Sequence, residues 1–542
     1  MVRWRDHVNT QTGIYEYAKQ GMSRWADRNA IFFYGRSLTY RQLFQEIDAA
    51  AERLAALGVG RGTVVTVHLP NCPQAIMAIY AIAKLGAVCN MVHALLPAEG
   101  LRKTMEFTES SILITGSHFP DCERLDFPRC ILHVDLSAFM GRVYQIGYRL
   151  KNHNRCPGNS IPFEVKQKTI IELPKQKNLK DECCLYMHSS GSTGMPKTVM
   201  LSHAALNHGV EMTRRYFSGV DLTKHVCLSV LPFFHALGFQ MDLHRVLSCG
   251  GTLVMMSRWD GKKATQFIKK YKVTVMVGVP VMYRDLAERK AFSGPRVQQL
   301  RECFVGGERV GAELKHKLDQ KLNSENTPCL LEGYGLTETA SVCAVLGKGH
   351  YNIDACGYPM HGVTAMLRQE DGSLLETGEG ELVFGAKSLM MGYLKDPEET
   401  KRVFIEWNGE RLIRTGDYGR IDNEGLIYFH DRIKNTIVRK GNNIFPVEVE
   451  SVIRMENGVK EVCVIGLTDE TAGTEIVCAC VVAQPNTEEK TLTAALKRRC
   501  EAYLPMVAVP SRVVFLQELP KNQMGKIDRR SLKQMICTKE SD

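Results

Sequence analysis

Short apolar runs recur through much of this 542-residue chain, and amphipathic helical patterns separate most of them. Runs this short and this apolar are typical of strands that are buried on both faces of a parallel sheet. They lie at residues 63–69, 112–116, 183–188, 226–231, 251–256, 273–279 and 303–307. The alternation predicts an α/β fold, in which helical layers cover largely parallel sheets.

The first long helix is predicted directly after residue 39. Thr39 and Gln42 have the spacing of a capping box, and the apolar residues that follow repeat at helical intervals. Gly58 follows the last of them and favours an end to the helix. A strand, a helix and a second strand are then predicted over residues 63–92, which would form a βαβ unit.

The pattern changes toward the C-terminus. From about residue 360 the buried runs give way to short strands and turns rich in Gly, Asp and Asn, and a separate α+β pattern follows. We therefore predict a large N-terminal domain over residues 1–431, which includes a short-strand β subdomain. A hinge at residues 432–434 would connect it to a small mobile α+β domain over residues 435–542.

Composition narrows the class of protein. The net charge of +10 is mild for this length and suits small anionic ligands as readily as nucleic acid or a membrane. The 18 cysteines show no CxxC pair, which favours reduced thiols over a zinc site. The first residues lack a leader pattern, and Lys84 interrupts the longest apolar stretch, so no membrane span is predicted. We expect a cytoplasmic protein that binds no nucleic acid.

A polar loop, SSGSTGMPK, follows one of the predicted strands at residues 189–197. Its spacing from Gly191 to Lys197 is close to that of a Walker P-loop, but Pro196 stands where a glycine is expected and has no N–H to donate. Seven of its nine residues are Ser, Thr, Gly or Lys, which suit either an anion-binding loop or a solvated hairpin.

Three further segments offer groups that suit a nucleotide. Tyr334 is an aromatic ring on which a purine can stack, and Glu338 is a carboxylate that can bind Mg²⁺. Asp417 is predicted in a tight turn flanked by glycines, where it can accept hydrogen bonds from ribose hydroxyls. Lys526 follows a glycine near the C-terminus. Each alone is equally well interpreted as a turn residue or a surface charge.

In this order the four segments resemble the motifs of the adenylate-forming superfamily, which comprises acyl- and aryl-CoA synthetases, firefly-type luciferases and the adenylation domains of peptide synthetases. The resemblance extends over residues 38–530. It implies that the loop at 189–197 closes over the β- and γ-phosphates of ATP, and proline before the lysine is normal in that family. Thr198 departs from the family, which usually has glycine there.

The resemblance also implies roles for individual residues. Thr337 would hydrogen-bond a phosphate, Glu338 would bind Mg²⁺, and Lys526 would bridge the carboxylate and the α-phosphate. Lys434 falls at the family's hinge, while Val438 replaces a lysine found in luciferases and plant coumarate ligases. The implied ATP-binding residues are Ser189, Ser190, Gly191, Ser192, Thr193, Gly194, Lys197, Gly307, Glu308, Glu332, Gly333, Tyr334, Gly335, Asp417 and Arg432.

The class of acid is predicted from residues 231–242. Amino-acid-activating relatives carry an aspartate in this region that pairs with the substrate ammonium, whereas this chain has Phe234 and His235, as acyl and aryl ligases do. We assign His235 a catalytic position in the wall of the acyl pocket, with Gly238 and Gly278 also lining it. A medium- or long-chain fatty acid is the first expectation, and an aryl acid is the alternative.

The acceptor is predicted from the C-terminal part. Residues 439–450 resemble the family's segment along which the pantetheine arm of CoA passes, with Gly441 allowing close backbone approach. Arg439 and Lys440 either bind the CoA phosphates or belong to a solvated face. Only sixteen residues follow Lys526, too few for a fused carrier domain. Free CoA is therefore expected as the acceptor, with loading of a separate carrier protein as the alternative. The intact nucleotide motifs argue against a non-catalytic relative.

A basic and aromatic stretch at residues 139–158 has no place in these motifs. It combines Arg142, Arg149, Lys151 and Arg155 with three aromatic residues. The stretch is either an ordinary amphipathic surface helix or a segment that lies on an anionic membrane. Membrane contact, if any, would be peripheral.

Overall fold

The computed structural model describes residues 10–20, 22–116, 128–151, 160–163, 178–189, 197–217, 220–307, 310, 312–322, 330–346, 352, 355–439, 442–469, 474–521 and 527–538. The chain divides into two compact units. Unit 1 comprises Met1–Ala365 and Phe384–Ile413, and unit 2 comprises Met366–Val383 and Arg414–Asp542. The boundaries that we predicted for the domains and the hinge remain predictions.

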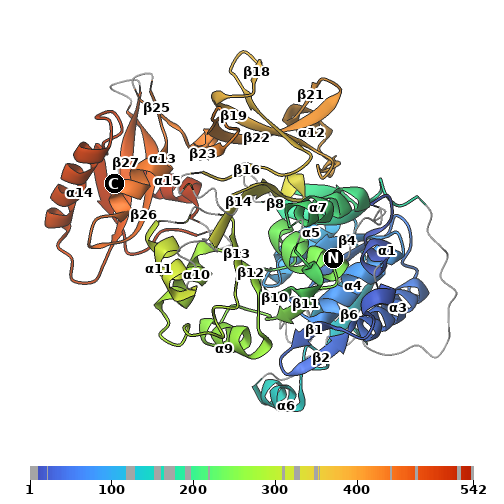
Figure 1. The fold of residues 1–542 in the computed structure, drawn as a ribbon. Helices are drawn as coiled ribbons and strands as arrows, with labels where there is room; N and C mark the ends of the chain where they lie inside the picture. The colour runs from blue at the N-terminus through green and yellow to red at the C-terminus, as the bar shows by residue number, and fades with distance from the viewer. Residues whose placement is uncertain are drawn as a thin grey trace. The chain divides into compact units, whose positions relative to one another are not determined.

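The first sheet of unit 1 has the strand order β16-β15-β14-β13-β12-β10-β11-β1-β2 (Figure 1). Its six central strands are parallel neighbours: β14 (Leu330–Leu336), β13 (Glu302–Val305), β12 (Val275–Gly278), β10 (Val226–Ser229), β11 (Thr252–Met255) and β1 (Asn29–Phe33). The antiparallel edges are β15 (Ser341–Val345), β16 (Tyr358–Pro359) and β2 (Arg36–Thr39). The parallel core of this sheet confirms the predicted α/β class.

A second sheet in unit 1 has the order β20-β9-β8-β4-β3-β5-β6-β7. Its parallel strands are β8 (Cys183–Ser189), β4 (Val88–Met91), β3 (Val64–His68), β5 (Ile112–Gly116), β6 (Cys130–Val134) and β7 (Ile161–Pro162). On the other side of β8 lie two antiparallel strands, β9 (Lys197–Ser202) and β20 (Gly392–Tyr393). The predicted phosphate loop thus connects β8 to β9.

The described helices of unit 1 are α1 (Ile14–Lys19), α2 (Met22–Trp25), α3 (Tyr40–Ala56), α4 (Pro73–Lys84), α5 (Ala98–Phe107), α6 (Arg142–Lys151), α7 (His203–Tyr216), α8 (Arg245–Ser248), α9 (Gly261–Tyr271), α10 (Pro280–Glu288), α11 (Ala312–Leu322) and α12 (Pro397–Val403). The capping box predicted at α3 is confirmed, because Gln42 N donates to Thr39 Oγ1 at 3.2 Å and Thr39 N donates to Gln42 Oε1 at 2.9 Å. Helix α4 packs against α3 and is buried from Pro73 to Ala83. None of the described helices is long and apolar enough to cross a membrane.

The short-strand β subdomain is a sheet with the order β18-β17-β19-β22-β21, and β23 pairs with β22. Its strands are β17 (Val363–Arg368), β18 (Leu374–Leu375), β19 (Gly378–Ala386), β21 (Phe404–Trp407), β22 (Glu410–Ile421) and β23 (Ile427–Arg432). The chain crosses from one unit to the other within β17, β19 and β22.

The C-terminal part of unit 2 is the predicted α+β layer. Its elements are β24 (Ile437–Arg439), β25 (Asn442–Ile444), α13 (Pro446–Arg454), β26 (Val459–Asp469), β27 (Thr474–Ala483), α14 (Glu489–Tyr503), β28 (Arg512–Phe515) and α15 (Arg529–Thr538). Side chains alternate between the two faces of β26, so Val462 and Val464 belong to one apolar cluster while Cys463 and Ile465 belong to another. The cysteines here act as small apolar core residues.

Candidate active site

The parallel strands β10, β12 and β13 of the first sheet end next to one another, and β14 pairs with β13 as far as Glu332 before it continues to Leu336. The segments that follow them are residues 230–238, 279–280, 306–307 and 337–339. In open parallel sheets, ligands bind outside the carboxyl ends of the strands. The fold therefore brings segments far apart in sequence to one edge of the sheet.

Gly306 allows these segments to approach one another closely, and Gly238 allows a close contact within the segment 230–238. A Cβ atom on Gly306 would lie 3.1 Å from Leu237 Cδ2 and 3.5 Å from the carbonyl oxygen of Gly333. A Cβ atom on Gly238 would lie only 2.3 Å from the carbonyl oxygen of Pro232, closer than real contacts permit. Gly238 is therefore required by the backbone, whether or not it also lines the acid pocket.

The segment after β10 carries Phe234 and His235. The Phe234 ring is buried, and its centroid lies 4.6 Å from that of His93 and 4.7 Å from that of His235. The buried carboxyl group of Asp242 accepts hydrogen bonds from the backbone N–H groups of Val230 at 3.2 Å and Leu231 at 3.1 Å. Burial raises the pKa of Asp242 to about 8, although the two backbone N–H groups lower it. This buried acid holds the segment in place.

Gly278 ends β12 beside Tyr283. A Cβ atom there would lie 3.0 Å from the Tyr283 ring and 3.2 Å from the Met276 methyl group. The Tyr283 hydroxyl lies within hydrogen-bond distance of the carbonyl oxygens of Met276, at 2.9 Å, and Phe304, at 2.8 Å, and it shares its single proton between them, which ties β12 to β13. The glycine thus leaves room for Tyr283, and its assignment to the acid pocket remains a prediction.

The predicted magnesium ligand follows β14. Thr337–Thr339 form one turn of 3₁₀ helix, in which Glu338 is half-buried. Glu338 Oε1 accepts a hydrogen bond from the Tyr393 hydroxyl at 2.9 Å, and its carbonyl oxygen accepts from Met390 N at 2.8 Å. The Tyr334 ring, which we expected to stack on a purine, is half-buried, with its centroid 5.5 Å from that of Phe384.

Tyr393 also contacts the phosphate-loop lysine. Lys197 Nζ lies 4.9 Å from the Tyr393 ring centroid, and the same ammonium forms an ion pair with Glu399. Burial raises the pKa of Glu399, but the combined effect of Lys197 and Arg402, which lower it, is larger, so the pKa lies below its ordinary value. Lys197, Tyr393, Glu338 and Glu399 thus form one connected group, which we call the lysine cluster.

The sequence had not marked Tyr393 or Glu399 as site residues. Asp396 begins helix α12, and its side chain accepts a hydrogen bond from Glu399 N at 3.0 Å. An Asp-Pro start followed by acidic residues was a visible sign of a helix N-terminus. It did not indicate that the helix lies beside the lysine.

Thr198, the residue that departs from the family's glycine, is buried and begins a chain of hydrogen bonds. Its hydroxyl lies 3.0 Å from His188 Nδ1, and His188 Nε2 lies 2.8 Å from Asn90 Oδ1. Asn90 Nδ2 donates in turn to the hydroxyls of Thr66 at 2.9 Å and Thr108 at 3.2 Å. Burial lowers the pKa of His188 to about 4, so its ring is neutral at pH 7.

Glu332, implied to bind ATP, is buried at the end of the parallel part of β14. Its Oε1 lies 2.9 Å from Lys315 Nζ and accepts a hydrogen bond from Val310 N at 3.2 Å. Lys315, on α11, is fully buried. One oxygen of this carboxylate is therefore engaged inside the protein.

Unit 2 contains the two residues that we expected to hold the ribose. Asp417 is buried, and its Oδ1 lies 2.8 Å from Arg432 Nε. The two residues face each other across β22 and β23. The prediction of a tight turn around Asp417 was wrong, because residues 410–421 form one strand. Its neighbour Gly416 has φ of +69°, so the glycine serves a local irregularity of the strand and not a turn.

Two family models match the chain. The AMP-binding enzyme model matches residues 18–394, and the AMP-binding enzyme C-terminal domain model matches residues 448–526. The first match covers more than half of the chain. The chain belongs to the AMP-binding enzyme family.

Curated relatives in this family cover nearly the whole chain. The long-chain-fatty-acid–CoA ligase of Bacillus subtilis (strain 168) is 29% identical over 543 residues, which cover 94% of this chain and 92% of the relative. The 4-coumarate-CoA ligase 1 of Narcissus pseudonarcissus is 27% identical over 554 residues, covering 98% and 95%.

Solved structures share the fold. The anthranilate CoA ligase AuaEII in complex with anthranoyl-AMP matches with a TM-score of 0.80 at 20% identity over 97% of each chain. The fatty acyl CoA synthetase of Mycobacterium tuberculosis matches with a TM-score of 0.68 at 25% identity, over 96% of this chain and 98% of that one. These matches confirm the fold class, a large N-terminal part with a smaller C-terminal part. The family and its acid–CoA ligases also confirm an AMP-forming acid–thiol ligase.

Several residues implied by the family resemblance lie outside the described residues. They are Ser190, Gly191, Ser192, Thr193, Gly194, Glu308, Lys440, Gly441 and Lys526. Of the others, Ser189 ends β8 and Gly307 has φ of +86°. Arg439 donates to the carbonyl oxygens of Val507 at 2.9 Å and Val509 at 3.2 Å, so part of its guanidinium is engaged within unit 2.

Proposed function

We propose that this enzyme activates a medium- or long-chain fatty acid with ATP to give acyl-AMP and diphosphate, and then transfers the acyl group to CoA with release of AMP. The burial and hydrogen bonding of Asp242 are the main support for an apolar acid as the substrate. It is the only acidic residue in the segment 231–242, and its fully buried carboxyl group accepts hydrogen bonds from two backbone N–H groups. An ammonium group on the substrate would therefore find no partner there.

The lysine cluster supports ATP as the activating substrate. The acid and the α-phosphate are both anionic, so the first half-reaction needs fixed positive charge where they meet. Lys197 supplies such charge at the end of the phosphate loop, and Tyr393 holds Glu338 beside it. In the same proposal Lys526 bridges the substrate carboxylate and the α-phosphate during adenylation, and His235 lies beside the reacting carboxylate.

Glu338 fits the magnesium ion that would accompany ATP. Mg²⁺ prefers oxygen ligands and is commonly bound by one or two carboxylates together with the phosphates. Among the described residues no group of three or more His, Cys, Asp or Glu side chains is placed to hold a metal on its own. Such an ion would neutralise phosphate charge, and Glu338 would orient it.

An aryl acid is the second candidate, because the relatives include 4-coumarate and anthranilate CoA ligases. A series of saturated fatty acids, 4-coumarate and anthranilate should be compared by AMP release that depends on both ATP and CoA. We expect the highest kcat/KM for a fatty acid. A kcat/KM tenfold higher for an aryl acid than for any fatty acid would overturn the choice of a fatty acid as substrate. Formation of acyl-adenylate without free acyl-CoA would indicate a carrier protein as the acceptor.

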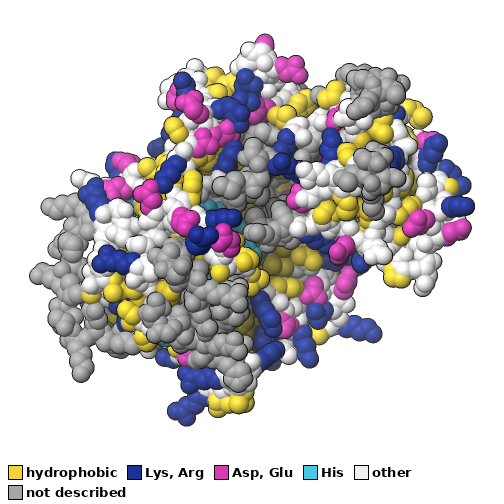
Figure 2. Space-filling model, turned by 180° about the vertical axis from the view of Figure 1, so that it is seen from behind, with side chains coloured by type: hydrophobic (Ala, Val, Ile, Leu, Met, Phe, Trp, Pro, Cys, Tyr) yellow, Lys and Arg dark blue, Asp and Glu magenta, His cyan; other side chains and the backbone are white. Residues whose placement is uncertain are grey.

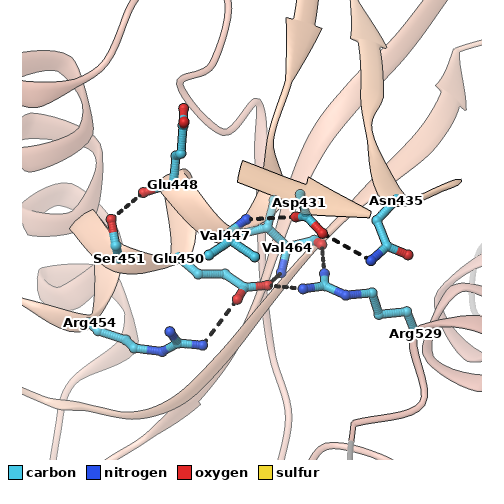
Figure 3. A network of polar contacts seen from close by, with 9 residues as sticks. All are labelled: Asp431, Asn435, Val447, Glu448, Glu450, Ser451, Arg454, Val464 and Arg529. Carbon is cyan, nitrogen blue, oxygen red and sulfur yellow. Dashed lines mark hydrogen bonds and ion pairs between the residues drawn. The ribbon is translucent and has the colours of Figure 1, made fainter. Parts of the chain in front are cut away.

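We further propose that residues 435–542 rotate about the hinge 432–434 between the two half-reactions. Contacts within unit 2 span this hinge (Figure 3). Asp431 Oδ2 accepts from Val447 N at 3.1 Å, and Asp431 Oδ1 accepts from Asn435 Nδ2 at 3.1 Å. Because Asp431 precedes the hinge and Val447 follows it, a large rotation would break the first of these bonds.

Neighbouring contacts hold the segments after the hinge together. Glu450, on α13, accepts from Arg529 Nη2 at 2.7 Å, Arg454 Nη2 at 3.0 Å and Val464 N at 2.9 Å (Figure 3). All of these residues follow the hinge, so a rotation leaves them intact. They support the idea that this part moves as one body.

Lys434→Pro tests the hinge, since proline fixes φ. The two half-reactions should be measured separately, by pyrophosphate exchange and by consumption of acyl-adenylate with CoA. We expect one rate to fall much more than the other. Lys434→Ala, which keeps the backbone free, is the matched control. Equal rates in the proline and alanine variants would place the hinge elsewhere.

A further inference from the structure

Helix α6 presents three apolar side chains to solvent. Val143 is 83% exposed, Ile146 61% and Leu150 79%. They occupy positions i, i+3 and i+7, which lie on one face of a helix. A row of apolar side chains this exposed is uncommon on a soluble surface and indicates a binding face.

The opposite face of α6 is attached to the protein. The Tyr144 ring centroid lies 5.6 Å from that of Tyr34, and Gln145 Nε2 donates to the carbonyl oxygen of Ser137 at 3.2 Å. Arg149 forms an ion pair with Asp135 at 2.9 Å. These contacts fix the rotation of the helix about its axis, so the apolar row points outward. In Figure 1 the helix lies at the lower edge of unit 1.

Positive charge borders the apolar row on both sides. At 100° per residue, Arg142 and Lys151 fall on opposite margins of the face that carries Val143, Ile146 and Leu150. Residues 136–163 contain no Asp or Glu. Figure 2 shows dark blue and yellow side chains together at the lower end of the molecule, where α6 lies.

We propose that α6 docks the protein on an anionic lipid surface. An interfacial helix needs an apolar face that enters the acyl boundary and cations that meet the head groups, and α6 has both. The cations on the margins favour an anionic lipid surface over a second copy of this chain, because two such faces would repel each other. This surface does not depend on the proposed reaction, although a fatty acid held in a membrane would then be close at hand.

Co-sedimentation with vesicles tests the proposal. The full chain is mixed with vesicles of phosphatidylcholine alone, or of phosphatidylcholine with phosphatidylglycerol. We expect binding to the anionic vesicles that weakens with salt. Arg142→Gln with Lys151→Gln should weaken it about 25-fold, at about fivefold for each cation near the surface. Ile146→Ser with Leu150→Ser should weaken it at least about tenfold.

Val281→Ser is the matched control, since Val281 is also 61% exposed on a helix, α10. Its binding should equal that of the wild type. The proposal is overturned if the wild type does not bind anionic vesicles, or if the α6 variants bind as Val281→Ser does. A wild-type dimer in light scattering that the α6 variants convert to a monomer, without vesicle binding, would overturn it in favour of a contact between copies.

Discussion

Replacing Lys315 with methionine should destabilise unit 1 by about 3–5 kcal/mol. Lys315 Nζ lies 2.9 Å from Glu332 Oε1, and the exposed fractions of the two side chains are 0% and 9%. Methionine fills much of the same volume, but it leaves a carboxylate in the interior without its cation. Removing one member of a buried pair costs more than the pair itself contributes, because the remaining charge is desolvated.

Removing both charges should cost far less. In Lys315→Met with Glu332→Gln, the amide oxygen can still accept from Val310 N, the bond that Glu332 makes at 3.2 Å. We expect this double variant to lie within about 1.5 kcal/mol of the wild type, since replacing a whole buried pair is often nearly neutral. The two substitutions should therefore be strongly non-additive.

Urea denaturation followed by tryptophan fluorescence is a suitable assay. The tryptophans that the structure describes, at positions 25, 259 and 407, belong to unit 1, so their signal reports the unit that contains the pair. If the double variant loses as much stability as the two single variants added together, the two charges do not interact. In a separate measurement, the KM for ATP of the double variant, compared with that of the wild type, would show whether Glu332 contacts the nucleotide.

Three further outcomes are expected. Glu399→Gln should lower the KM for ATP about two- to fivefold, because the partly exposed ion pair of Glu399 with Lys197 competes with phosphate for that lysine. Glu398→Gln, at the exposed neighbouring residue, is the control, and equal KM values for the two variants would exclude such competition. Thr198→Val should lower the free energy of unfolding by about 1–3 kcal/mol, because His188 loses a buried hydrogen-bond partner, whereas Thr198→Ser keeps the hydroxyl and should leave the stability unchanged. Identical urea midpoints for the valine and serine variants would contradict this. Lys526→Ala should slow pyrophosphate exchange about 10²–10³-fold and spare thioester formation from supplied acyl-adenylate; equal losses would refute the role.

The elements could be predicted because each is specified by its own residues. The apolar run at 226–231 forms β10, and the capping box at Thr39 begins α3. The lysine cluster could not be predicted in this way. Its contacts join Lys197 to Glu399 and Tyr393 to Glu338, pairs that are 202 and 55 residues apart, so only the folded chain brings them together.

Local pattern also gave a wrong answer where tertiary pairing decides the conformation. Two glycines around Asp417 are typical of a turn, yet the segment pairs with β23 and continues as part of strand β22. Family resemblance was the only guide to Lys526 and the CoA segment, because a lysine or glycine in a polar stretch has no local signature of function.

The buried carboxyl group of Asp242 stays protonated in the folded chain at neutral pH, which links the folding of unit 1 to proton binding. With a pKa of about 8 in the folded chain, against an ordinary value of 3.8, the carboxyl keeps a proton that the unfolded chain has already released at neutral pH. Stability from this group is fully present below about pH 4 and is lost as the pH rises toward 8. Unfolding near neutral pH should therefore release a proton from this site, so part of the measured enthalpy will vary with the ionisation enthalpy of the buffer. Asp242→Asn should remove that part.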